Sequence, residues 1–132
     1  MIKLVKNKKG FSLVEFMIAI VVLTIGLLAL VGLQSTAIKG NASAKNLTSA
    51  VLLAEKKMEE FKNTAFNSLT IGTTNDPNNP LTSSDGSGGF FNRSWAIQTY
   101  LGSTYMKQIT VTITWAVGGR SYSTAVDTVI SR

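Results

Sequence analysis

The chain of 132 residues contains no cysteine and no histidine. The missing cysteines exclude a disulfide framework and a thiolate metal site. The missing histidines remove the commonest general base and the commonest nitrogen ligand for metals. The sequence also shows no pairing of a nucleophile with a base. We therefore expect no enzymatic activity, no cofactor and no bound metal, and we expect side-chain packing to supply the stability.

Proline and charge are both missing from the first part of the chain. The two prolines are Pro77 and Pro80, so nothing forces a sharp kink in an earlier helix. Residues 16–33 include no charged residue, and eighteen such positions meet the threshold for a membrane-spanning helix. Counted from Phe11, the apolar run is about 23 residues, or about 35 Å of helix, which is enough to cross a bilayer.

Basic residues are distributed unevenly around this run. The first basic residues after it are Lys39 and Lys45. Four lysines precede it, namely Lys3, Lys6, Lys8 and Lys9. This asymmetry predicts that the N-terminus is cytoplasmic and that the chain beyond about Leu33 lies on the other side of the membrane.

The net charge of +6 depends on those same lysines. If a leader ending at Gly10 is removed, nine basic and seven acidic side chains remain, a net of +2. In the last third of the chain the basic residues are few and scattered along the sequence; they include Arg93, Lys107 and Arg120. Binding of nucleic acid, which a pI of 9.8 would otherwise favour, is therefore not expected.

Glu15 lies at the start of the apolar run, five residues after Gly10. On insertion scales an ionised side chain costs about 2.5–3.5 kcal/mol at mid-membrane and less near an interface, so a partner is expected. Cleavage after Gly10 would give Phe11 an α-amino group that is positive near neutral pH. An opposite charge about 4 Å away is worth about 4 kcal/mol at an effective dielectric constant of about 20. Glu15 could pair with this amine within one helix or between subunits, or it could sit in water at the interface.

The sequence divides into five segments. Residues 1–10 form a basic leader, 11–33 a membrane-spanning helix, and 34–63 its amphipathic continuation. Residues 64–89 are rich in Asn, Thr, Ser, Asp and Gly and predict an exposed loop. Residues 90–132 predict an antiparallel β head. The apolar face of the continuation is expected to consist of Leu47, Val51, Ala54, Met58 and Phe61.

Period-two alternation supports the β prediction. Residues 95–101, 109–117 and 122–130 alternate apolar with polar or small side chains. Gly118 and Gly119 predict a two-residue hairpin turn. About three strands should pack on the helix, giving an α+β fold. Trp95 and Trp115 are expected in the core. Asp76 and Asp85 resemble calcium ligands only in residue type, because the EF-hand spacing is absent, and a solvated loop is expected instead.

Residues 9–15, Lys-Gly-Phe-Ser-Leu-Val-Glu, and the apolar residues that follow resemble the class III signal and N-methylation motif of type IV pilins and type II secretion pseudopilins. The resemblance implies cleavage after Gly10 by a prepilin peptidase and N-methylation of Phe11. It implies that Glu15 contacts the Phe11 amine of a neighbouring subunit. It also implies a precursor in the inner membrane, an assembly platform there, and other pilins and minor pilins as partners in a pilus at the cell surface.

Residues 24–34 and 50–59 are similar to PilV-type minor pilins, the type IV pilus modification proteins, and residues 50–59 are similar also to I-type minor pseudopilins. Many major pilins carry a proline in the N-terminal helix and a C-terminal disulfide loop, and this chain has neither. The resemblance therefore favours a minor type IV pilin. The alternatives are a minor pseudopilin of a type II secretion system and, from another class, an adhesin or DNA-binding module displayed on a pilus.

Overall fold

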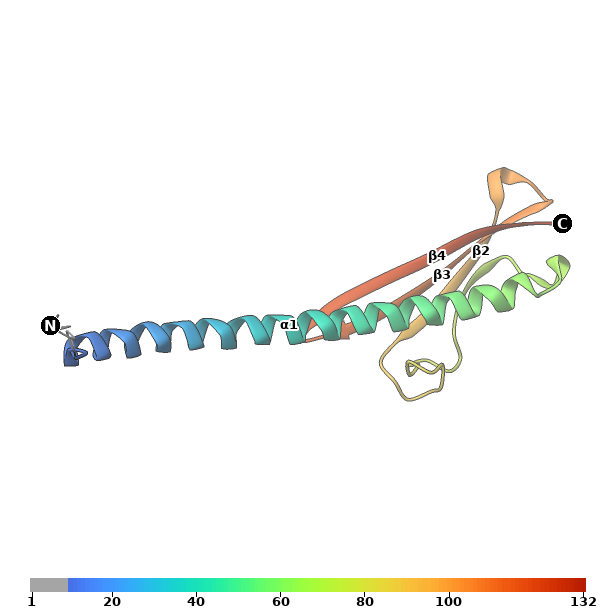
Figure 1. Ribbon diagram of the computed structural model, residues 1–132. Helices are drawn as coiled ribbons and strands as arrows, with labels where there is room; N and C mark the ends of the chain where they lie inside the picture. The colour runs from blue at the N-terminus through green and yellow to red at the C-terminus, as the bar shows by residue number, and fades with distance from the viewer. Residues whose placement is uncertain (1–9) are drawn as a thin grey trace, which may run out of the picture. The chain divides into compact units, whose positions relative to one another are not determined.

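The computed structural model describes residues 10–132, which form one helix and one sheet (Figure 1). The elements are α1 (Leu13–Lys62), η1 (Phe66–Ser68), β1 (Gly72–Asn75), β2 (Asn92–Thr99), η2 (Tyr100–Gly102), β3 (Met106–Val117) and β4 (Arg120–Ser131). The chain divides into two compact units, Met1–Ala42 and Ser43–Arg132. The predicted fold class is confirmed: α+β, with a long N-terminal helix and a small antiparallel sheet.

The helix α1 is unbroken over 50 residues, as expected for a segment without proline. Its first backbone hydrogen bond runs from the amide of Phe16 to the carbonyl oxygen of Ser12, 3.1 Å away. The helix therefore begins two residues later than expected. Further along, the Thr24 hydroxyl donates to the Ile20 carbonyl oxygen at 2.8 Å. This bond satisfies a polar group within an apolar stretch.

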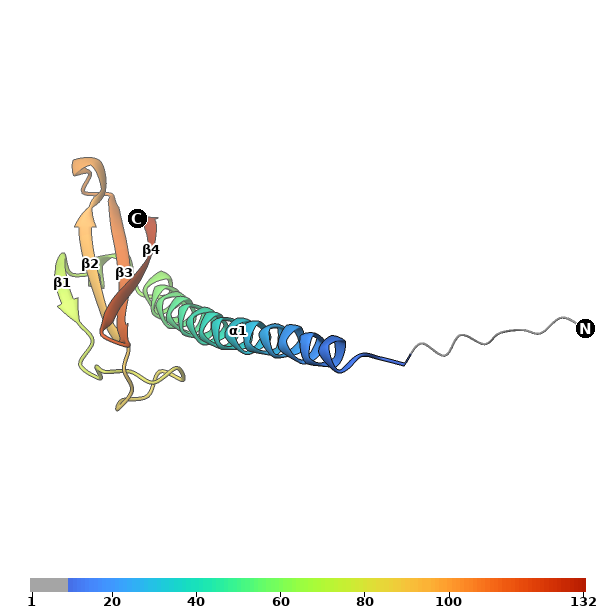
Figure 2. The ribbon, with the colours of Figure 1, turned by 90° about the vertical axis from the view of Figure 1, so that its left-hand side faces the viewer.

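The sheet is an antiparallel meander in the order β1-β2-β3-β4 (Figure 2). It has four strands where about three were expected. The additional strand, β1, pairs with β2 from Gly72 opposite Ile97 to Asn75 opposite Ser94. All four β1 residues are exposed, and the sequence Gly-Thr-Thr-Asn has no apolar alternation. Pairing with β2, rather than burial of its own side chains, holds this strand in place.

The hairpin between β3 and β4 turns where expected. Gly118 and Gly119 have φ angles of 59° and 77°, the left-handed values that a two-residue type I′ turn requires at both positions. The expectation that Leu101 continues the preceding strand is wrong. Leu101 lies in η2 with φ at 49° and is 84% exposed, because the chain turns toward β3 at this point.

The core lies between the sheet and the part of α1 that belongs to the second unit. The helix contributes a stripe that shares Ala54, Met58 and Phe61 with the expected one. Leu47 is instead exposed and Val51 half-buried, and Ala50 and Leu53 are buried in their place. The complete buried set of α1 is Ala50, Leu53, Ala54, Met58 and Phe61.

The sheet covers this stripe with the inward side chains of β2 and β3. Ile109, Val111 and Ile113 are fully buried and Trp115 is 6% exposed, which confirms the predicted alternation and the core position of Trp115. Trp95 is half-buried against the same cluster. Alternate residues of β4 from Thr124 to Ile130 are also half-buried.

Candidate assembly site

The bond between Gly10 and Phe11 lies just ahead of α1, in a stretch without helix or strand. Phe11 is 83% exposed, and no heavy atom lies within 4 Å of the position that a Cβ on Gly10 would occupy. A processing enzyme that needs an extended, accessible backbone would find one here. The lysines of the predicted leader, Lys3, Lys6, Lys8 and Lys9, lie outside the described residues.

Glu15 lies in the first turn of α1. The first-turn amide groups have no partner in the helix, and the helix dipole places partial positive charge there, so a carboxylate is favoured at this end. Glu15 follows Phe11 by four residues, a spacing of about one helical turn. The start of the helix thus carries one acidic group close in sequence to the bond at which cleavage is predicted.

The N-terminal part of α1 exposes its apolar surface on all sides. Every described residue from 10 to 42 is exposed. The most apolar window of 18 residues has a mean hydropathy of 2.9, and none of it is buried within the described chain. Soluble monomers rarely expose apolar patches beyond a few hundred Å². This surface therefore requires a bilayer or other subunits around it.

Comparison with known proteins gives a match that covers the N-terminal segment of the chain. Residues 5–31 match the family described as the prokaryotic N-terminal methylation motif. The chain carries a type IV pilin-like class III signal. No curated protein and no solved structure matches the chain significantly.

The motif supports a pilin-like or pseudopilin subunit. Such subunits are structural proteins, are processed by a prepilin peptidase and assemble with other pilins. A class III signal followed by a helix of this length and hydropathy also fits a precursor anchored in the membrane. These conclusions depend on the first 31 residues and leave the second unit to be interpreted from its own structure.

The segment predicted as an exposed loop over 64–89 is in part buried. Leu69, Asp76 and Leu81 are each less than 7% exposed, although Ile71 is exposed. Leu81 is held by reciprocal backbone hydrogen bonds with Phe91. The polar composition of the segment indicated turns correctly, and Leu69 and Ile71 were the apolar residues expected to pin its start, of which only Leu69 is buried. The composition gave no signal that Asp76 and Leu81 also fasten those turns to the domain.

Arg93 is the residue that holds the 64–89 segment against the rest of the second unit. It lies on the inward face of β2 and is 4% exposed. Its Nε and Nη2 atoms donate to Asp76 Oδ2 at 2.8 and 2.6 Å. Its Nη1 donates to the carbonyl oxygen of Leu53 in α1 at 3.1 Å. One side chain therefore joins helix, sheet and loop.

Two further residues complete the cluster. The side-chain amide of Asn79 exchanges two hydrogen bonds of 2.8 Å with the backbone of Arg93. Asp85 Oδ1 lies 2.8 Å from Arg93 Nη1, at ion-pair distance but outside hydrogen-bond geometry. The second oxygen of Asp85 lies 2.9 Å from Lys56 Nζ. The carboxylates of Asp76 and Asp85 thus face cations of the protein itself.

Electrostatics favour the ionised form of Asp76. Burial alone would raise the pKa of Asp76, but the Asn78 amide and the Arg93 guanidinium outweigh burial and hold the pKa below its ordinary value of 3.8. Within residues 10–132 no three acidic, histidine or cysteine side chains gather as metal ligands would. The acidic residues of this segment serve as partners for Arg93.

Two lysines of the second unit are also engaged by protein groups. The Nζ atom of Lys57 lies 4.5 Å from the ring centre of Trp95 and 2.8 Å from Glu60. Lys107 donates to the carbonyl oxygens of Phe66 and Leu69 at 2.8 and 2.6 Å. With Arg93 buried as well, these cations do not form a basic surface for nucleic acid.

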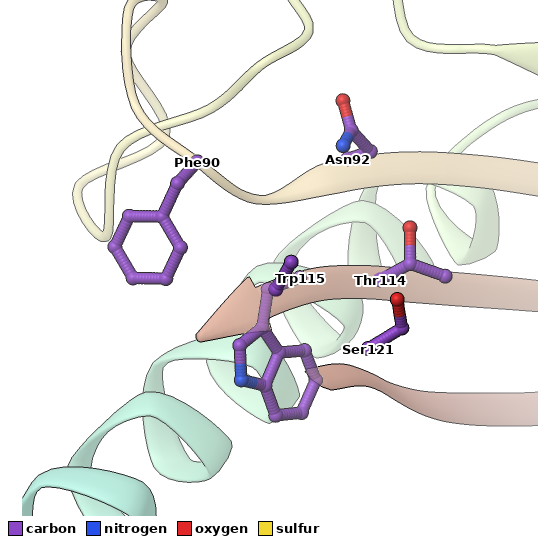
Figure 3. A pocket seen from close by; sticks show the side chains of 6 residues that line it. Phe90, Asn92, Thr114, Trp115 and Ser121 are labelled. Carbon is purple, nitrogen blue, oxygen red and sulfur yellow. The ribbon is translucent and has the colours of Figure 1, made fainter. Parts of the chain in front are cut away.

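A small hollow of about 230 Å³ lies at the end of β3 (Figure 3). Its lining contains no group that titrates near neutral pH, and so it offers no general acid or base. Trp115, which lines it, stacks on Tyr122 with ring centres 5.8 Å apart. The residues around the hollow are Phe90, Asn92, Thr114, Trp115, Ala116 and Ser121.

Proposed function

We propose that the chain is a minor type IV pilin, a non-enzymatic subunit that enters a pilus or its priming complex through α1. The observation that carries the proposal is the class III signal at residues 5–31, joined directly to a helix whose apolar surface has no cover of its own. The precursor waits in the inner membrane and leaves it when other subunits replace lipid around the helix.

The proposed processing is the one that the class III signal implies. A prepilin peptidase cleaves after Gly10, and Phe11 becomes the methylated first residue of the mature chain. The leader lysines Lys3, Lys6, Lys8 and Lys9 hold the leader on the cytoplasmic side. Glu15 then meets the Phe11 amine of a neighbouring subunit. Desolvation of both charges in the apolar bundle makes this pairing selective for the correct register.

Mass spectrometry of the protein isolated from its own cells tests the processing. We expect loss of ten residues and gain of one methyl group on Phe11. Gly10→Ala should leave the precursor in the membrane, because only glycine leaves this site without a side chain. An uncleaved wild-type chain, or normal cleavage of the Gly10→Ala variant, would overturn the proposal.

A minor pseudopilin of a type II secretion system would use the same signal and the same helix. Deletion of the gene separates the two functions. We expect surface pili to be lost and protein secretion to be unchanged. Loss of secretion with normal pili would assign the chain to the secretion system.

A further inference from the structure

The outer edge of β4 is an open hydrogen-bonding edge. β4 is the last strand of the sheet and pairs with β3 alone. In an antiparallel pair, alternate residues point their N–H and C=O groups away from the neighbouring strand. Within residues 10–132, no backbone or side-chain hydrogen bond reaches these groups along β4. They are left to solvent or to another chain.

This edge has few of the devices that normally protect an edge strand: its charged residues are Arg120, at its start, and Asp127. Natural edges are short, bulged, or carry lysine or proline. β4 is 12 residues long and contains neither lysine nor proline. Its register with β3 runs without interruption from Met106 opposite Ser131 to Val117 opposite Arg120, so no bulge bends it. The opposite edge, β1, has only four residues.

A groove of about 290 Å³ lies beside this edge, between β4 and α1. Its floor is apolar, formed by Met58 from the helix and Val126 from the strand. Its helical wall carries Glu55, Glu59 and Lys62, all of them exposed, so the wall bears one excess negative charge. Among the described residues neither glutamate has an ion-pair partner. Like charges one turn apart repel each other, so a cation is favoured beside them.

We propose that the outer edge of β4 accepts an extended segment of a partner subunit, which adds a fifth strand to the sheet. Its backbone would bond to β4, and every second side chain would enter the groove. Those side chains would be apolar over Met58 and Val126 and basic beside Glu55 and Glu59. That the partner is another pilin-like subunit rests on the proposed function.

A second copy of this chain fits the groove less well. If two copies joined edge to edge, each would offer the inward residues of β4 to the other. Between residues 122 and 130 these are Tyr122, Thr124, Val126, Thr128 and Ile130. None is basic, so a second copy would bring no cation to balance the excess negative charge that Glu55 and Glu59 leave beside Lys62.

Peptide binding to the full-length protein in detergent micelles tests the surface. The probe is a blocked nonapeptide, Thr-Val-Thr-Lys-Thr-Val-Thr-Lys-Thr, whose inward face alternates valine and lysine, compared with its glutamate counterpart. We expect the lysine peptide to slow hydrogen exchange of β4 amides and to leave the β1 edge unchanged. The glutamate peptide should bind about tenfold more weakly, the change that about 1.4 kcal/mol produces.

Substitutions in the groove test whether its charges select the peptide. Glu55→Gln with Glu59→Gln leaves Lys62 as the charge of the groove wall and should therefore abolish or reverse the preference for the lysine peptide. Both substituted residues are exposed, so folding is unaffected. Glu60→Gln, on the same helix but outside the groove, should preserve the difference. Equal protection of β1, or equal binding of both peptides to the unaltered protein, would overturn the proposal. Protection of β4 without peptide in self-associated protein would identify a second copy as the occupant.

A cellular test separates this inference from the proposed function. Thr128→Lys places a charge on the inward, half-buried face of β4, whereas Asp127→Lys places the same charge on the outward face. We expect both variants to be cleaved and inserted normally and only Thr128→Lys to reduce assembly several-fold. Equal assembly of the two variants would overturn the strand-addition proposal. An unprocessed wild-type chain would instead overturn the proposed function and leave the peptide results standing.

Discussion

The Nη1 atom of Arg93 lies 3.1 Å from the carbonyl oxygen of Leu53, so a side chain of the sheet bonds directly to the backbone of the helix. Carbonyl groups inside a helix normally have only their intrahelical partner. The same guanidinium binds Asp76, which draws the segment after β1 onto the domain. The arrangement of the second unit therefore depends on one buried cation.

Arg93→Met should destabilise the second unit by about 3–5 kcal/mol, because Asp76 would remain buried without its partner. Chemical unfolding of the full chain in micelles, followed by circular dichroism, measures the change. Arg120→Met is the matched control, because Arg120 is exposed, and should shift the free energy of unfolding by no more than about 0.5 kcal/mol. If the two variants were equally stable, the central role of Arg93 would be wrong.

The pH dependence of stability should follow Asp76. Its pKa in the folded protein is lower than its ordinary value, so folding favours the ionised carboxylate. The resulting stabilisation is complete above the ordinary pKa and is lost as the pH falls through the folded pKa. Unfolding measured from pH 7 down to about pH 2 should show this loss. Asp76→Asn should be less stable at neutral pH and should show a flatter acid limb. An unchanged acid limb would contradict the assignment.

Gly89 is expected to tolerate no side chain. A Cβ atom there would overlap the carbonyl group of Leu81, and Leu81 is fully buried, so the backbone must move. Gly89→Ala should cost about 3 kcal/mol or more. Gly86→Ala is the milder control: its Cβ would lie 3.3 Å from the Thr82 hydroxyl, which accepts a hydrogen bond from the Gly86 amide and needs to shift only slightly. Thermal unfolding of both variants measures the difference, and equal midpoints would rule out the predicted overlap.

Lys107 is expected to hold the connection between α1 and β1. Its Nζ donates to two carbonyl oxygens and lies 4.4 Å from the ring centre of Phe66. Lys107→Met keeps the length of the side chain but loses these bonds, at a cost of about 1–3 kcal/mol. Hydrogen exchange should quicken in residues 66–69. Unchanged exchange there would show that the connection is held by other contacts.

The sequence predicted the parts of the molecule that have strong periodicity. The apolar run defined α1, and the alternation in β3 and β4 defined the sheet and its Gly118-Gly119 turn. It did not predict β1, whose four exposed residues have no apolar pattern and depend on β2. It predicted three of the five buried positions of α1, namely Ala54, Met58 and Phe61, but not Ala50 and Leu53, because the apolar residues of this stretch, which include the exposed Leu47 and Leu52, cover more of the helix than the part that meets the sheet.

The Arg93 cluster could have been inferred from one detail. Arg93 follows the same alternation as Trp95 and Ile97, which places a charge on the inward face of a strand. A charge at such a position needs a buried partner. Nothing in the sequence indicated that the partner would be Asp76, because the two residues are 17 positions apart and the segment between them follows a path that is set by the folded domain.

Glu15→Val is expected to leave processing intact and to impair assembly. The substitution does not touch the cleavage site at Gly10, and valine is at least as compatible with the membrane as glutamate. It removes the proposed partner of the Phe11 amine, which would then be buried in the subunit bundle without an opposite charge. Immunoblots of cell fractions should show normal cleavage and a several-fold loss from sheared pili. Thr24→Val is the control, because it also removes a polar group from the apolar part of α1, but one whose partner is the carbonyl of Ile20 in the same helix. If the Glu15→Val and Thr24→Val variants assembled into pili equally well, the Phe11 amine of a neighbouring subunit would not need a carboxylate from this chain.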